Sequence, residues 1–90
     1  MYVNMPEISR FLGIIIKMYY NDHGPSHFHA EYNEYEAAIS IDNMSIIEGY
    51  LPPRVLGITI EWAEQHKNEL FLNWKNCRNK EKLLKIAPLV

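Results

Sequence analysis

The chain has 90 residues, of which 48% are hydrophobic, and a formal net charge of −2 at pH 7. This length suits one domain, residues 1–90, with a single core, and the charge argues against a general nucleic-acid binder. The lone cysteine, Cys77, excludes an intrachain disulfide and is typical of a reducing compartment. The apolar run at residues 11–20 is too short to span a bilayer and no leader-peptide pattern precedes it, so we expect a cytoplasmic protein without a membrane partner.

The charges are unevenly distributed along the chain. Residues 1–66 carry three basic and nine acidic side chains, whereas residues 67–90 carry six basic and two acidic ones. The basic C-terminal part could contact RNA, DNA or an acidic protein, and it could equally be the solvated end of a helix with a tail. Because a domain of this size is only marginally stable alone, we expect a partner, either a second small protein or another copy of the chain.

Four segments are predicted to be strands. They follow a lead-in at residues 1–9, and they are rich in β-branched, aromatic or alternating apolar side chains. Residues typical of turns separate them, most densely at residues 21–26. The predicted strands span residues 10–20, 27–32, 35–41 and 44–49. Because each reversal joins segments that are neighbours in the chain, we expect a small antiparallel sheet of three or four strands.

One long helix is predicted after the sheet. Pro52 and Pro53 suit its first turn, where an N–H would have no partner, and residues 54–78 contain no further proline. Apolar side chains recur there at spacings of three and four, which predicts a helix packed on one face of the sheet. Gly57 should weaken this helix by about 1 kcal/mol relative to alanine. Residues 83–90 form an apolar tail that should dock back, and can do so as an edge strand. The expected fold class is therefore α+β.

The predicted second strand carries the most informative side chains. Alternation along a strand puts His27, His29 and Glu31 on one face, and the apolar neighbours Phe28 and Ala30 on the other. Asp22 and His23 lie just upstream in the predicted turn. No other segment of the sequence concentrates groups that titrate or bind metal near neutral pH in this way. We therefore place the candidate site on the polar face of this strand.

Metal binding is one interpretation of this pattern. Two imidazoles at positions i and i+2 of a strand can bind one ion, and catalytic zinc sites commonly combine three protein ligands with an open position. We predict His23, His27 and His29 as ligands of a divalent metal such as zinc, with Glu31 and Asp22 as alternatives for the third position. The pattern also arises in histidines that only make structural hydrogen bonds, and this interpretation stays open.

Acid–base catalysis without a metal is the other chemical interpretation. A pair of histidines can supply a base and an acid near pH 7, as phosphodiester cleavage requires. Lys17 should lie on the same face of the neighbouring strand, where it could stabilise a negatively charged phosphate. Glu31 or Asp22 would orient an imidazole. An ordinary solvent-facing lysine is the alternative for Lys17.

Several runs of the sequence are similar to one family. They lie at residues 5–16, 18–23, 25–32, 49–54, 61–64 and 84–89. Together they resemble the small bacterial family catalogued as domain of unknown function 4160, over about residues 5–89. Ser26 stands where a second proline is common, and Gly57 stands where a bulkier helix former is common. Neither departure touches His27 or His29.

The resemblance implies a context rather than a reaction. Members of this family are often encoded beside a second small protein, in pairs that look like toxin–antitoxin modules. Our leading hypothesis is a component of such a module, with a ribonuclease-type toxin using His27, His29, Lys17 and Glu31 as one form of it. The alternative is a non-catalytic protein-binding or adaptor domain, stabilised by a metal. A third hypothesis is DNA binding through Lys80, Lys82 and Lys85. Whether the chain is an enzyme stays open.

Overall fold

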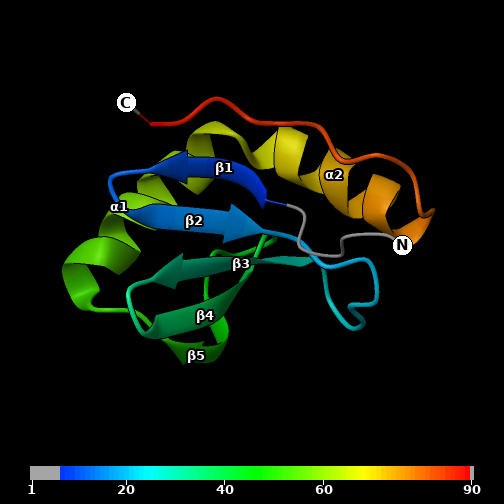
Figure 1. The fold of residues 1–90 in the computed structure, drawn as a ribbon. Helices are drawn as coiled ribbons and strands as arrows, with labels where there is room; N and C mark the ends of the chain where they lie inside the picture. Colours follow the sequence, from blue (N-terminus) through cyan, green and yellow to red (C-terminus); the bar gives the residue numbers. More distant parts are fainter. Residues whose placement is uncertain (1–6, 90) are drawn as a thin grey trace.

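A computed structural model describes residues 7–89 as an α+β fold in which helices pack against one antiparallel sheet (Figure 1). Five strands follow one another across the sheet in chain order, and each pairs antiparallel with the next. None of the described helices is long and apolar enough to cross a membrane. The elements are β1 (Glu7–Phe11), β2 (Ile14–Lys17), β3 (His27–Tyr32), β4 (Tyr35–Ser40), β5 (Ile46–Tyr50), α1 (Pro53–Gln65) and α2 (Lys67–Arg78).

The first predicted strand, at residues 10–20, corresponds to two strands in the structure. The prediction of three or four strands was therefore too low, because the sheet has five. A tight hairpin at Leu12 and Gly13 separates β1 from β2, and both residues have positive φ, 52° and 80°. This is the pattern of a two-residue type I′ turn. The continuous apolar run concealed it, because leucine is not a turn residue. The part of β1 at residues 7–9 was predicted as a lead-in, and residues 1–6 of that lead-in lie outside the described chain. By contrast, the predicted reversal between β3 and β4 is confirmed, with Asn33 at φ 54°.

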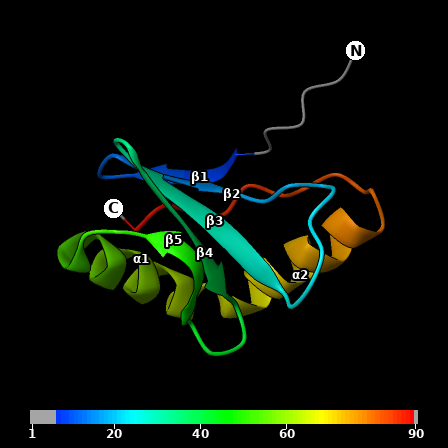
Figure 2. The same ribbon diagram turned by 90° about the horizontal axis from the view of Figure 1, so that it is seen from below.

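The predicted single helix is wrong in one respect, because it is divided at His66. This residue has φ −122° and ψ 27°, which ends α1 and precedes α2. No proline or glycine lies at the break, so the local sequence contains no signal that predicts the end of a helix there. Figure 2 shows the two helices end to end beneath the twisted sheet, with a change of direction between them. Two short helices with a bend between them can therefore stay in contact with the twisted sheet, whereas one straight helix of this length would diverge from it.

The core lies between the helices and one face of the sheet. Alternation on the strands delivers Ile16, Phe28 and Ile39 to this face, and all three are fully buried. Trp62 of α1 lies beneath them, with its ring centroid 6.2 Å from that of Phe28. Burying side chains of this size contributes about 1.5–3 kcal/mol each, so this layer supplies most of the stability. The helix stripe predicted from the sequence is confirmed on α1 and α2, and its buried members include Val55, Thr59, Trp62, Ala63, Leu70, Trp74 and Cys77.

The C-terminal tail docks back on the domain, as predicted, although not as a strand. The buried side chain of Asn73 donates to the carbonyl of Leu84 and accepts from its N–H, at 2.8 and 2.9 Å. The indole of Trp62 donates to the carbonyl of Ala87 at 2.8 Å. One backbone bond, from the N–H of Ile86 to Ile8, joins the tail to the outer edge of β1. The tail thus contacts both helices, at Trp62 and Asn73, and covers the edge of the sheet that β1 forms.

The outer strand β5 departs from regular geometry. Ile47 is an extra residue in its pairing with β4, which makes a β-bulge. Gly49 has φ +88°, and an added Cβ there would lie 2.2 Å from the carbonyl oxygen of Glu36. Only glycine allows this close approach of the two backbones.

We expect Gly49→Ala to destabilise the protein by about 2 kcal/mol or more, because the new methyl group meets backbone atoms and the residue must keep a positive φ. Gly57→Ala is the matched control. Outside the backbone of its own helix, no heavy atom lies within 4 Å of its added Cβ, so the helix should gain about 0.5–1 kcal/mol. Urea unfolding measures both free energies. Equal urea midpoints for Gly49→Ala and the wild type would contradict the close approach.

Candidate functional site

Pairing of β3 with its neighbours assembles the polar face of the sheet. His29 lies opposite Lys17 of β2 and Ala38 of β4, and Glu31 lies opposite Glu36. Directly opposed residues share a face, so these side chains lie together on the face opposite to that of the buried Phe28 and Ala30. The predicted division of β3 into a core face and a polar face is confirmed. The rings of His27 and His29 are neighbours on it, 5.1 Å apart between centroids.

The carboxylate of Asp22 joins the two histidines. The loop between β2 and β3 folds back over the strand, held by backbone bonds from Asp22 to Tyr19 and from Ile41 to Ser26. One oxygen of Asp22, Oδ2, lies 3.1 Å from Nε2 of His27 and 2.8 Å from Nε2 of His29. The two imidazoles and the carboxylate therefore converge on one point above the sheet.

The other ring nitrogen of each histidine faces an oxygen. Nδ1 of His27 lies 2.8 Å from the carbonyl oxygen of Pro25, which can only accept, so this nitrogen donates. Nδ1 of His29 lies 3.4 Å from Oε2 of Glu36. Each ring is thus oriented by a partner on its Nδ1 side and presents its Nε2 to Asp22.

Aromatic rings pack around the histidines. His27 lies against Trp74 of α2, with ring centroids 5.0 Å apart, and its side chain is only 9% exposed. The edge of Tyr19 packs on His29 at 4.6 Å. Burial and the nearby carboxylates of Glu36, Glu31 and Asp22 raise the pKa of Tyr19, so its hydroxyl keeps its proton at neutral pH. His29 and Asp22 remain partly open to solvent.

Lys17 and Glu31, both predicted as catalytic residues, bind each other. The ammonium of Lys17 lies 2.9 Å from Oε2 of Glu31, and the lysine side chain is 8% exposed. The two side chains share the face with His29, as predicted from the alternation. Among the described residues, the carboxylates that contact an imidazole on this face are those of Asp22 and Glu36.

His23, predicted as the third metal ligand, is exposed in the loop and lies outside the converging group. Within residues 7–89, the set whose ligand atoms lie within 4.8 Å of one another is Asp22, His27 and His29. Asp22 was one of the alternatives read from the sequence. Glu36 was missed, although the short turn at Asn33 implies its place diagonal to His29 across the hairpin.

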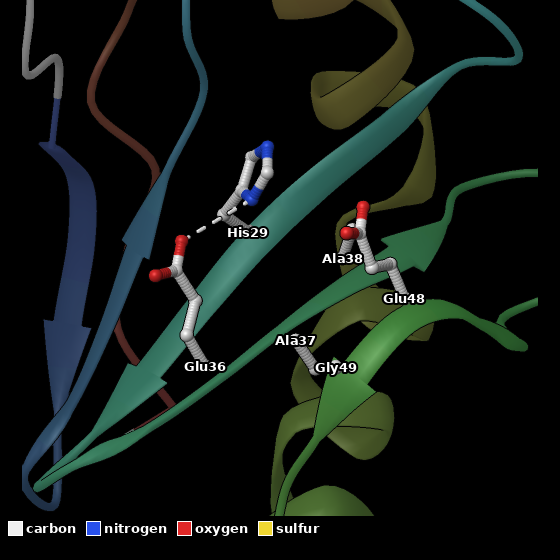
Figure 3. Close-up of a pocket in the computed structure, with 6 residues that line it drawn as sticks. All are labelled: His29, Glu36, Ala37, Ala38, Glu48 and Gly49. Atoms are coloured by element: carbon white, nitrogen blue, oxygen red, sulfur yellow. Dashed lines mark ion pairs between the residues drawn. The ribbon is translucent and has the colours of Figure 1, made fainter.

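A hollow of about 300 Å³ adjoins the site between β3, β4 and β5. Figure 3 shows Glu36 and Glu48 on either side of it, with the ring of His29 above and the small residues Ala37, Ala38 and Gly49 at its floor. Small side chains and the glycine leave this space above the sheet. With two carboxylates at its rim, the hollow favours positively charged groups.

A protein-family model described as domain of unknown function (DUF4160) matches residues 13–75. The chain belongs to this family. The matched segment of the DUF4160 domain runs from the β1–β2 turn into α2, and it includes Asp22, His27, His29 and the residues of the hollow. The resemblance predicted from the sequence over about residues 5–89 is thereby confirmed for residues 13–75. Searches of curated proteins and of solved structures give no match. The family description carries no activity, so function has to be argued from the site.

Cys77 is expected to react slowly as a nucleophile. Burial, and to a lesser degree the charge of Asp22, raises the pKa of its thiol to about 11, and the thiol donates to the carbonyl of Tyr19. At pH 8 only about a thousandth of it would be thiolate, against roughly a tenth or more for a free cysteine. Alkylation by iodoacetamide, followed by mass spectrometry, should be at least tenfold slower in the native protein than in urea. Equal rates would contradict the burial of this thiol.

Proposed function

We propose that this DUF4160 protein is the toxin-like member of a two-protein bacterial module and that it cleaves RNA at the Asp22–His27–His29 site. One observation carries the proposal. Two imidazole Nε2 atoms share a single carboxylate oxygen, at 3.1 and 2.8 Å, and of the three residues His29 and Asp22 are partly open to solvent. A bridged pair of histidines can take up and release protons together.

RNA cleavage asks for two proton transfers. The 2′-hydroxyl attacks the phosphorus and gives its proton to a base, while the departing 5′-oxygen takes a proton from an acid. His29 is the more exposed imidazole and is assigned to the substrate side. His29 takes the proton of the 2′-hydroxyl, shares it with His27 through the Asp22 carboxylate that lies between the two Nε2 atoms, and then gives a proton to the departing 5′-oxygen, so that no proton is gained or lost. The Glu36 carboxylate lies 3.4 Å from Nδ1 of His29, where it would stabilise the imidazolium that forms when His29 takes up a proton.

The basic end of α2 supports a polyanionic substrate. The thiol of Cys77 bonds to the backbone of Tyr19, and the hydroxyl of Tyr20 bonds to the backbone of Glu81. These contacts hold the end of α2 and the following turn against the segment that leads to Asp22. Exposed basic side chains on this end could bind the phosphates of a strand that reaches the site; they are Lys75, Arg78, Lys80 and Lys82.

A non-catalytic binding domain is the second candidate, and specific observations favour it. Lys17 is paired with Glu31, and the hollow carries two further carboxylates, so the centre of the face is acidic. Several large apolar side chains are also exposed, in the β1–β2 turn, on β5, and on α2 and the tail, where a partner protein could cover them. They are Leu12, Ile47, Tyr50, Phe71, Leu72 and Leu84.

The first test is expression in bacterial cells with growth and total RNA followed together. We expect the wild type to arrest growth and degrade RNA, and His29→Gln and Asp22→Asn to lose at least tenfold of the RNA-cleaving rate of purified protein. Both substitutions keep the size of the side chain while removing its proton-transfer role. His23→Ala is the matched control, because this exposed imidazole lies outside the converging group. Normal growth and intact RNA with the wild type would reject ribonuclease activity and favour the binding domain.

The second test measures the affinity for single-stranded RNA as a function of salt. Lys80→Gln and Lys82→Gln should weaken binding and should lower the slope of log affinity against log salt by about 0.7 for each phosphate contact that is lost. Lys67→Gln is the control, because its ammonium binds the carbonyl of Asp42, in the turn between β4 and β5. An unchanged slope in the first two variants would remove the basic end of α2 from the RNA-binding surface.

A further inference from the structure

We propose that Asp22, His27 and His29 bind a divalent transition-metal ion of the zinc class through Oδ2 of the aspartate and Nε2 of each histidine. The inference does not rest on RNA cleavage, because the site could hold an ion in either of the functions proposed above. It revises the ligand set expected from the sequence by putting Asp22 in the place of His23.

The separations between the three atoms suit one ion. Bonds of 2.0–2.1 Å to a tetrahedral zinc place two ligand atoms about 3.3 Å apart. Oδ2 of Asp22 is 3.1 Å from one Nε2 and 2.8 Å from the other, and all three ligand atoms lie within 4.8 Å of one another. Coordination of zinc would lengthen both contacts of Oδ2 by a few tenths of an ångström and would place the two Nε2 atoms, which lie within 4.8 Å of each other, about 3.3 Å apart.

The orientation of the rings points to a cation at the centre. Histidines that bind metal almost always donate their other N–H to a carbonyl or a carboxylate. His27 donates from Nδ1 to the carbonyl of Pro25, and Nδ1 of His29 faces Glu36. With Nδ1 as its donor, a neutral His27 presents the lone pair of its Nε2 to the acceptor Oδ2 of Asp22. Nε2 of His29 can donate to the same oxygen at 2.8 Å, or, with the ring proton on Nδ1, it can bind a metal ion. A hydrogen-bonding proton joins two of the three atoms, whereas a metal ion joins all three.

The donor set and the surrounding charge decide the class of ion. Two imidazoles with one carboxylate suit zinc and its neighbours in the first transition row, whereas calcium and magnesium prefer oxygen ligands alone. Glu36 and Glu48 lie beside the site and add negative charge. Lys17, which lies opposite His29 on β2, is paired with Glu31, so the pair adds no net positive charge beside the site. The local field therefore favours a dication.

Three protein ligands leave one coordination position open. Structural zinc sites are usually closed by four protein ligands, whereas catalytic ones keep a position for water or substrate. The open side here faces solvent, since His27 is covered by Trp74 while His29 and Asp22 are partly exposed. The hollow shown in Figure 3 has His29 among its lining residues, so it adjoins one of the three ligands.

The test uses protein without a histidine tag, which would bind metal itself. The full chain is stripped with a chelator and dialysed against zinc or cobalt(II), and bound metal is measured by elemental analysis. We expect one ion per chain, a higher melting temperature with metal, and the visible absorption of a tetrahedral cobalt(II) site. Asp22→Asn and His29→Gln should abolish all three signals, whereas His23→Ala should keep them. Circular dichroism shows that each variant is folded.

Glu36→Gln tests the orienting contact at a more exposed side chain, where the fold is not at risk. We expect it to lower zinc affinity by about 10- to 100-fold without changing the stoichiometry. The proposal is overturned if the wild type binds no stoichiometric zinc or cobalt, or if His23→Ala loses the ion as His29→Gln does. One bound ion without RNA cleavage supports the metal site and rejects only the ribonuclease activity. RNA cleavage by fully metal-free protein of unchanged stability overturns only the metal site.

Discussion

The alternation of side chains along β3 is the constraint on which the rest of the structure depends. This central strand sends Phe28 and Ala30 into the core, where both are fully buried, and sends His27 and His29 to the opposite face. A shift of one residue in its register would exchange the two sets and place imidazoles against Trp62. The cost of that exchange holds the register in place. The apolar core therefore fixes the positions of the two histidines, and one of its members, Trp74, packs directly on His27.

The sequence predicts the β3–β4 hairpin, the shared face of the histidines and the docked tail, because these follow from local periodicity and turn residues. It does not predict the Leu12–Gly13 turn, since a leucine at positive φ carries no turn signal, or the break at His66, which has no proline or glycine. The role of Asp22 is also beyond sequence periodicity. Its position depends on the path of a loop that is fixed by Tyr19 and by Ile41 of a distant turn. Glu36 is intermediate, because its place follows once the hairpin register is known.

The site and the C-terminal part of the chain support each other. Trp74 covers His27, Cys77 bonds to Tyr19, and Asn73 on the same helix holds the tail through two hydrogen bonds. Loss of the tail would remove both hydrogen bonds of Asn73, each worth about 0.5–1.5 kcal/mol, and would expose the surface that the tail covers. Changes in the tail should therefore reach the loop of Asp22 through α2, whichever of the two functions the domain performs.

The geometry of β5 limits how another protein can join this domain. Many small proteins recruit partners by strand addition, in which a foreign segment extends the sheet through backbone hydrogen bonds. Here the tail occupies the outer edge of β1. On β5, the bulge at Ile47 and the positive φ of Gly49 disturb the regular spacing of the backbone hydrogen-bonding groups. Both edges of the sheet are thus poor templates for a further strand. A cognate protein would have to recognise side chains, and the same feature should keep crowded copies of the domain from forming fibrils.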